Sequence, residues 1–278
     1  MNAYFSILGS TALIAFVFFL IEWFVPGEDQ PPVASRLFNY LYYPFVLAWV
    51  MGLQIVLAPL YIMLIGAAQG GALTHVLQQP TGPIAMLAFA LGFAVIWDVW
   101  QYWVHRWQHT SSVLWQTHKL HHADTAINAS SQARQHLLNY LLFNLAYAPM
   151  LMLFGSLSPH VIATFVMFRL WGFVIHANVR IHLGPLTGVI SGPQWHRIHH
   201  SRQPEHLDRN FAVFFPFIDM LFGTYYRPGR DEYPPTGLAH ETPEPILSGA
   251  TVAPFVVWWR GLTRRRTIHV RQTEAQID

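Results

Sequence analysis

Eight histidines in three short boxes are the residues of this chain best suited to do chemistry. The boxes read HRWQH, HKLHH and HRIHH, and their histidines are His105 and His109, then His118, His121 and His122, then His196, His199 and His200. On a helix, residues three or four positions apart lie on one side, so each box directs its imidazoles the same way. Each box is therefore predicted to present a cluster of nitrogen donors.

The donor type and the number of donors indicate a pair of metal ions. Imidazole nitrogen suits iron, zinc, copper or nickel, whereas magnesium and calcium prefer oxygen ligands, which the boxes lack. One zinc ion takes about four ligands, or about three and a water in a catalytic site. Eight donors exceed that number, which favours two metals side by side. A single histidine more often caps a helix or forms a hydrogen bond, but three boxes together favour the metal hypothesis.

Asp98 is a candidate partner of these ligands. It precedes His105 by seven residues and lies on the same predicted helix face as His105 and His109. A carboxylate in that position can accept the spare N–H of a ligating histidine and fix its ring orientation. The alternative is that Asp98 pairs with Arg106 or caps a neighbouring segment.

The string HANVRIH adds further candidates downstream. His176 is predicted as a ninth ligand, because a third segment must contribute donors if each of two metals is to have four or five. His182 is either a further ligand or a surface residue, and Asn178, beside His176, is a candidate catalytic residue. His136, in the string RQHLLNY, is predicted to contact a ligand or the substrate.

The composition requires that membrane helices position these residues. Of the 278 residues, 53% are hydrophobic and 11% are charged, whereas about 25% are charged in ordinary globular proteins. The absence of cysteine excludes disulfides, protein-ligated iron–sulfur clusters and haem-thiolate chemistry from this chain. Nucleic acid is not indicated as a partner, because the basic residues border apolar segments instead of forming a basic face.

Five apolar runs predict an all-α, polytopic membrane protein with four to five membrane segments. Runs 4–25, 43–68 and 84–104 are long enough to span, since a spanning helix needs about 20 residues. Runs 137–154 and 161–175 are broken by Pro149 and by a turn at 155–159, and they predict a hairpin. Residues 250–259 are too short to span and predict an interfacial anchor, because three arginines follow at 264–266.

Basic residues predict the orientation. They gather after the third run and after the hairpin, and the loops on the opposite side have none, so the histidine boxes are predicted to be cytoplasmic. The hairpin returns the chain to its starting side, which allows the boxes to form one His-rich di-metal cap. Arg169, inside the returning arm, is a candidate functional charge, or it pairs with an acidic group or extends toward the interface; the structural role is favoured. The expected division is membrane helices in 1–83, the catalytic region in 84–226 and an interfacial tail in 227–278.

Several motifs together resemble the fatty acid hydroxylase superfamily, which includes sterol desaturases, sterol methyl oxidases, sphingolipid hydroxylases and alkylglycerol monooxygenase. The similarity runs from about Ile96 to Tyr226 and rests on DVWQYWVHRWQH, WQTHKLHH, HAN, QWHRIHH and DRNFAVFFPFIDMLFGTYY. It implies two iron ions and dioxygen as co-substrate, with hydroxylation or desaturation of a sterol, hopanoid, fatty acyl or sphingolipid chain. Zinc can occupy the same donors in purified samples.

The sequence points to an external source of electrons. The chain has no glycine fingerprint for a dinucleotide and no haem-binding string, so a separate ferredoxin, cytochrome-b-type protein or reductase is implied.

Two other functions are compatible with histidine-rich membrane helices. One is carotenoid hydroxylation. The other is that of a membrane metal transporter or sensor, which is disfavoured because the first two runs contain only Glu22 as a charge.

Overall fold

Five long helices follow the five apolar runs in this computed structural model, which describes residues 2–28, 33–67, 82–154, 159–239 and 246–274. They are α1 (Asn2–Phe24), α2 (Val33–Ala67), α3 (Pro83–Thr110), α5 (Leu137–Phe154) and α6 (Pro159–His176). Four of them, α1, α2, α3 and α5, are long and apolar enough to cross a membrane, and α6 contains a shorter apolar stretch. The prediction of an all-α protein with several membrane helices is confirmed.

Two details of the predicted runs are wrong. Helix α2 begins at Val33, ten residues before the predicted run, because its polar first turns have tertiary partners: Asn39 Nδ2 donates to Ser130 Oγ at 3.0 Å and Arg36 contacts Glu22. Helix α5 continues through Pro149, which was expected to break it. A proline removes one backbone donor, and membrane helices tolerate that loss. The predicted turn lies mostly in 155–158, outside the described residues.

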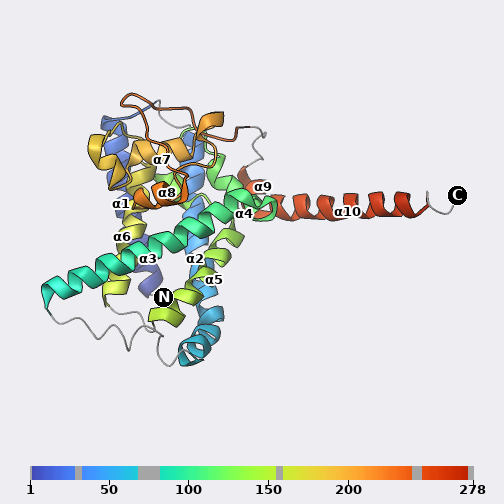
Figure 1. Ribbon diagram of the computed structural model, residues 1–278, viewed down its shortest axis with the longest axis horizontal. Helices are drawn as coiled ribbons and strands as arrows, with labels where there is room; N and C mark the ends of the chain where they lie inside the picture. Colours follow the sequence, from blue (N-terminus) through green and yellow to red (C-terminus); the bar gives the residue numbers. More distant parts are fainter. Residues whose placement is uncertain (1, 29–32, 68–81, 155–158, 240–245, 275–278) are drawn as a thin grey trace.

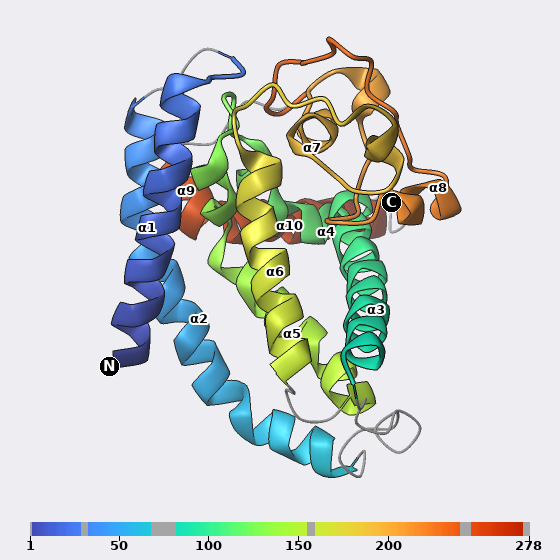
Figure 2. The ribbon, with the colours of Figure 1, turned by 90° about the vertical axis from the view of Figure 1, so that its left-hand side faces the viewer.

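Shorter helices form a cap at one end of this bundle. They are α4 (Ser112–His122), η1 (Ala129–Ala133), η2 (Gly184–Gly188), α7 (Pro193–His199), η3 (Pro204–His206) and α8 (Phe217–Phe222), where η denotes a 3-10 helix. Figure 2 shows α1 and α2 side by side, with α6 and α5 in the middle, α3 opposite, and α7 and the loops around it above them. Helices α9 (Ile246–Thr251) and α10 (Ala253–Glu274) follow, and α10 projects sideways from the bundle in Figure 1.

Aromatic side chains hold the bundle to the cap. Phe93 and Trp97 of α3 pack with Phe154 of α5 and Phe168 of α6 inside the bundle. A second cluster joins Tyr102 of α3 to residues of α7 and of the segment around α8. The end of α3 that carries His105 and His109 is therefore fixed against the cap.

A buried carboxylate joins α1 to three other segments. Glu22 is only 1% exposed and forms an ion pair with Arg36 of α2 at 2.8 Å. Its carboxylate also accepts hydrogen bonds from the backbone amides of Ala129 at 2.7 Å and Asn178 at 2.9 Å. These partners belong to α2, to η1 and to the loop after α6. The one charge noted in the first predicted run is thus a structural junction next to the histidine cap.

Candidate metal centre

Four helices carry the histidines to one place. Helix α3 ends at Thr110, and Ser111 begins α4 by accepting the amide of Leu114 on its Oγ at 3.3 Å, so the first two boxes lie on two adjoining helices. His176 is the last residue of α6. The third box lies on α7 and on its C-terminal cap, His200.

The structure brings nine of the ten predicted metal ligands into two neighbouring groups. The five-histidine group contains His105, His109, His118, His122 and His199, and the four-histidine group contains His121, His176, His196 and His200. Within each group, ligand nitrogens all lie within 4.8 Å of one another. The groups abut, since the stacked rings of His122 and His200 have centroids 4.3 Å apart.

The Nε2 atoms converge at distances that suit a shared ion. In the five-histidine group, the Nε2 pairs His105–His118, His109–His122 and His118–His122 lie 3.1, 3.1 and 3.2 Å apart. In the four-histidine group, the pairs His121–His176, His176–His196 and His196–His200 lie 3.1, 3.1 and 3.2 Å apart. Two nitrogens bound at about 2.1 Å to one ion are separated by about 3.0 Å in octahedral and about 3.4 Å in tetrahedral geometry. The donor sets therefore fit metal ions.

One loop orients three histidines of the five-histidine group through their other ring nitrogen. The contacts are His109 Nδ1 with Asp208 Oδ1 at 3.4 Å, His199 Nδ1 with Arg209 O at 2.9 Å, and His105 Nδ1 with Phe211 O at 2.9 Å. A carbonyl oxygen only accepts, so Nδ1 donates and Nε2 keeps its lone pair for a metal. His199 Nε2 is buried and has no hydrogen-bond partner, which is consistent with this role.

This loop has a backbone that its residue types allow. Asp208 and Asn210 have positive φ angles of 56° and 60°, which aspartate and asparagine adopt more readily than most residues. Asn210 also accepts the amide of Tyr226 at 2.8 Å and donates to Trp195 O at 3.2 Å. The spacing of residues in the sequence did not point to Asp208, although the DRN string contains the two residue types that signal such a turn.

Burial of the histidine side chains in the cap keeps them neutral. It lowers the pKa of His118, His121, His122, His196, His199 and His200 well below the usual value, and the neighbouring imidazoles lower the pKa further. The hydrogen bond to His109 lowers the pKa of Asp208. Neutral imidazole and ionised carboxylate are the forms that a metal site requires.

Asp98 does not contact a histidine as expected. Its two oxygens accept the amides of Val213 at 2.9 Å, Phe214 at 2.9 Å and Phe215 at 2.7 Å. The reason is that the segment after the 208–211 loop lies against α3 and presents three consecutive N–H groups there. Asp98 thus positions this segment and acts on His105 only through it.

The other three candidates also lie outside both groups. His182 Nδ1 contacts Gln194 Oε1 at 2.8 Å, and His136 Nε2 contacts Thr251 O at 2.9 Å. Asn178 Oδ1 accepts the amide of Glu28 at 3.1 Å, and its own amide binds Glu22. None of the three belongs to either histidine group. His182 is exposed, in agreement with the surface alternative, and the catalytic or substrate-side roles of Asn178 and His136 stay predictions.

Comparison with known proteins supports the assignment made from the motifs. The sequence model described as fatty acid hydroxylase matches residues 90–224, which include all nine grouped histidines. Residues 90–224 belong to the fatty acid hydroxylase family. No solved structure matches the chain significantly.

The names of similar proteins refer to different lipids. Human alkylglycerol monooxygenase is 34% identical over 54% of this chain and 33% of its own length. The ornithine lipid hydroxylase of Rhizobium tropici is 28% identical over 55% of this chain and 46% of its own length. A Δ7-sterol 5(6)-desaturase of Gibberella zeae is 31% identical over 49% of this chain and 37% of its own length. The matched part of the chain thus spans between a third and half of these relatives.

The structure gives a reason for the last motif that resembles the fatty acid hydroxylase family. The five consecutive backbone amides of residues 211–215 donate to two buried carboxylates. Asp219 accepts the amides of Phe211 at 2.8 Å and Ala212 at 2.9 Å, and Asp98 accepts the other three. Burial raises the pKa of Asp219 to about 6 against the lowering effect of these bonds. Two aspartates distant in sequence therefore hold the segment 211–215, which begins at the His105 contact.

Replacing Asp98 with alanine is expected to destabilise the protein. The change leaves three partly buried amides without their acceptor, and each amide left unsatisfied away from water costs about 1 to 3 kcal/mol. Thermal unfolding in detergent measures the effect as a lower midpoint temperature, and Asp98→Asn, which retains one acceptor oxygen, is expected to lose less. Asp231→Asn, at an exposed loop position, is the control. An unchanged midpoint for Asp98→Ala contradicts the assignment.

Proposed function

We propose that this chain is a membrane-bound nonhaem di-iron oxidase that uses dioxygen to hydroxylate or desaturate a lipid chain. The observation that carries the proposal is the pair of histidine groups, whose Nε2 atoms converge in a buried cap on membrane helices. The lipid names of the relatives support a lipid substrate. The nine grouped histidines are the proposed ligands, and iron held by them supplies the redox chemistry that no side chain offers.

A cavity at the histidines, with aromatic and aliphatic side chains in its lining, supports the lipid part of this proposal. It has a volume of about 230 Å³, and His105, His118, His121, His176 and His196 line it. The rest of its lining includes Phe143, Phe165, Phe168, Ile175 and Val213. A lipid carbon placed there lies against the histidine cap, where ions held by the histidines would supply the chemistry for an unactivated C–H bond.

A second cavity reaches the five-histidine group from the other side. It measures about 370 Å³ and is lined by His109, His122 and His199 together with Trp115 and Asp208. Lipid and non-lipid reactants thus have separate approaches. We propose that a separate electron donor serves the site on this side, and that this side is cytoplasmic, as the distribution of basic residues predicts.

Lipid analysis with isotopically labelled dioxygen tests the proposed reaction. Cells that express the intact chain are expected to contain a lipid with labelled oxygen that cells expressing His121→Ala lack. Loss of two hydrogens without label indicates desaturation instead. Identical lipid profiles from both cells, with a compatible donor supplied and folded, iron-loaded protein present, contradict the proposal.

A further inference from the structure

Arg169 is a cationic residue whose side chain is directed into internal space near the histidines. It lies on α6, seven residues before His176, so the two share one face of the helix about 10 Å apart along its axis. The residue is exposed, and it lines both the cavity at the histidines and a neighbouring cavity of about 340 Å³. The guanidinium is therefore accessible to a ligand inside the bundle.

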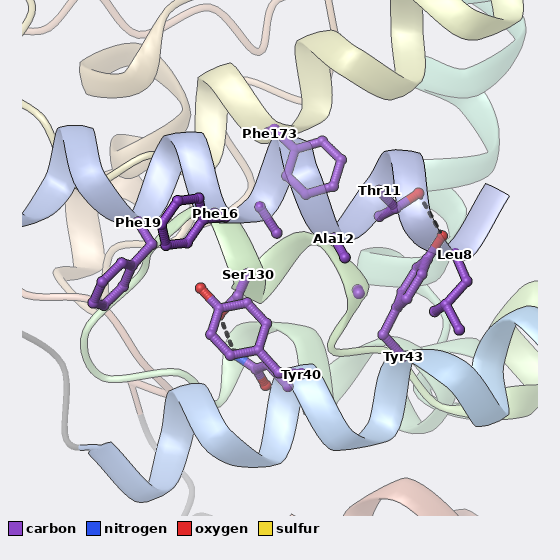
Figure 3. A pocket seen from close by; sticks show the side chains of 12 residues that line it. Leu8, Thr11, Ala12, Phe16, Phe19, Tyr40, Tyr43, Ser130 and Phe173 are labelled. Atoms are coloured by element: carbon purple, nitrogen blue, oxygen red, sulfur yellow. Dashed lines mark hydrogen bonds between the residues drawn. The ribbon is translucent and has the colours of Figure 1, made fainter. Parts of the chain in front are cut away.

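Three adjacent cavities lead from the outer helices to the histidines. The first, about 370 Å³, lies between α1 and α2, and Figure 3 shows Phe16, Phe19, Tyr40 and Phe173 around it. It shares Tyr43, Ala133 and Phe173 with the second cavity, and the second shares Arg169 and five other residues with the cavity at the histidines. The first cavity is almost wholly apolar, as an alkyl tail requires.

The second cavity differs from the first because polar side chains line it. Gln54, Gln101, Gln132, Gln135 and Asn144 face it together with Arg169. Polar side chains at membrane depth are unfavourable unless they have partners or a function. Their concentration between an apolar cavity and the histidines indicates a binding site for the polar part of a lipid.

The contacts of Arg169 leave its charge without an acidic partner. Its guanidinium donates to Tyr43 Oη and lies 5.6 Å from the centre of the Tyr43 ring. Among the residues that the structure describes, no carboxylate forms an ion pair with it. The acidic partner expected for Arg169 is therefore not found there.

Gln132 supplies an acceptor among the residues that line the same two cavities as Arg169. Its Nε2 donates to the Arg169 carbonyl oxygen at 2.9 Å, which fixes the orientation of the amide, because a carbonyl oxygen only accepts. Its Oε1 is buried and has no hydrogen-bond partner. A cationic donor and a free acceptor in the lining of the same cavities suit an oxygen group that accepts one hydrogen bond and donates another.

We propose that Arg169 and Gln132 bind an oxygen-bearing group of the lipid substrate, a hydroxyl foremost, between the second cavity and the histidines. The inference rests on the proposed function and adds the class of substrate: a lipid with a small oxygen group and a single alkyl tail, the tail lying in the first cavity. Arg169 is thus a specificity residue and not a metal ligand.

Equilibrium binding to the purified full-length protein tests this site without turnover. Radiolabelled octadecanol is the probe, and unlabelled octadecane and octadecanoate are the competitors. A charge-assisted hydrogen bond is expected to make octadecanol bind about tenfold or more tightly than octadecane, and Arg169→Met is expected to remove that difference. Octadecanoate that competes better than octadecanol supports the site and identifies a carboxylate as its preferred oxygen group.

Two variants keep the result interpretable. Arg169→Lys retains the charge and is expected to keep part of the preference if Arg169→Met fails to fold. Arg202→Met removes an exposed arginine outside the cavities and is expected to bind octadecanol as the unmodified protein does. Equal binding of octadecane and octadecanol, or an unchanged preference in folded Arg169→Met, overturns the inference. Normal octadecanol binding by iron-loaded protein that oxidises no lipid, with a compatible donor supplied, rejects the proposed oxidase instead and leaves the binding site standing.

Discussion

Replacing His121 with alanine is expected to empty the four-histidine group and to lower turnover by more than about 100-fold. The expectation exceeds the 10- to 100-fold loss that follows removal of residues that only support metal ligands. His199→Ala is expected to act in the same way on the five-histidine group. Metal analysis of purified protein, with turnover measured on the same samples, separates these effects. Each variant is expected to retain more iron than the double variant, because the groups share no histidine.

Histidines outside the groups supply the matched controls for this experiment. His182 contacts Gln194, and His136 contacts Thr251 O, so alanine at either position is expected to leave the metal content unchanged. Full iron content and full turnover in both His121→Ala and His199→Ala contradict the assignment of the groups. Loss of iron in His182→Ala restores the ligand role that the sequence suggested for that residue.

Replacing Glu22 with alanine is expected to lower the free energy of unfolding by about 3 to 5 kcal/mol. Breaking a buried ion pair by removing one partner has an effect of this size, because the remaining charge stays buried. Two amides also lose their acceptor. Denaturant titration in detergent micelles measures the change. Because the partners of Glu22 hold the loop after His176, the metal content is expected to fall as well.

The chain contains a matched pair at its surface. Arg180 and Glu28 also lie 2.8 Å apart, but their side chains are 57% and 33% exposed, and pairs of this kind contribute about 0 to 1 kcal/mol. Glu28→Ala is therefore expected to have a much smaller effect. The double variant Glu22→Gln with Arg36→Met removes both charges and is expected to recover part of the loss. Equal effects of Glu22→Ala and Glu28→Ala contradict the structural role of Glu22.

The sequence predicted the features that depend on short-range spacing. Helical periodicity placed His105 and His109 on one face, and the length of the apolar runs predicted the membrane helices. His176 was predicted from the number of ligands that two ions need, and it lies in the four-histidine group. These features depend on helix geometry and on the bilayer thickness, which are the same in every protein.

Contacts between segments that are far apart in the sequence could not be predicted from residue spacing. Asp98 has the right spacing for a histidine partner, yet three amides more than a hundred residues away occupy it. Asp208 contacts His109 from a loop whose position follows only from the packing of the cap. His182 resembles a ligand in the sequence, but Gln194 holds its ring elsewhere. Long-range hydrogen bonds decide these cases, and residue spacing does not contain them.

The distribution of the histidines over four helices sets the order in which the centre can form during biosynthesis. The five-histidine group needs α3, α4 and α7, and the four-histidine group needs α4, α6 and α7. Neither donor set is complete until the ribosome has released α7, after the hairpin of α5 and α6 has been inserted. Completion of either donor set is therefore a late step of maturation, and a nascent chain that stops before Gln194 holds only partial sites.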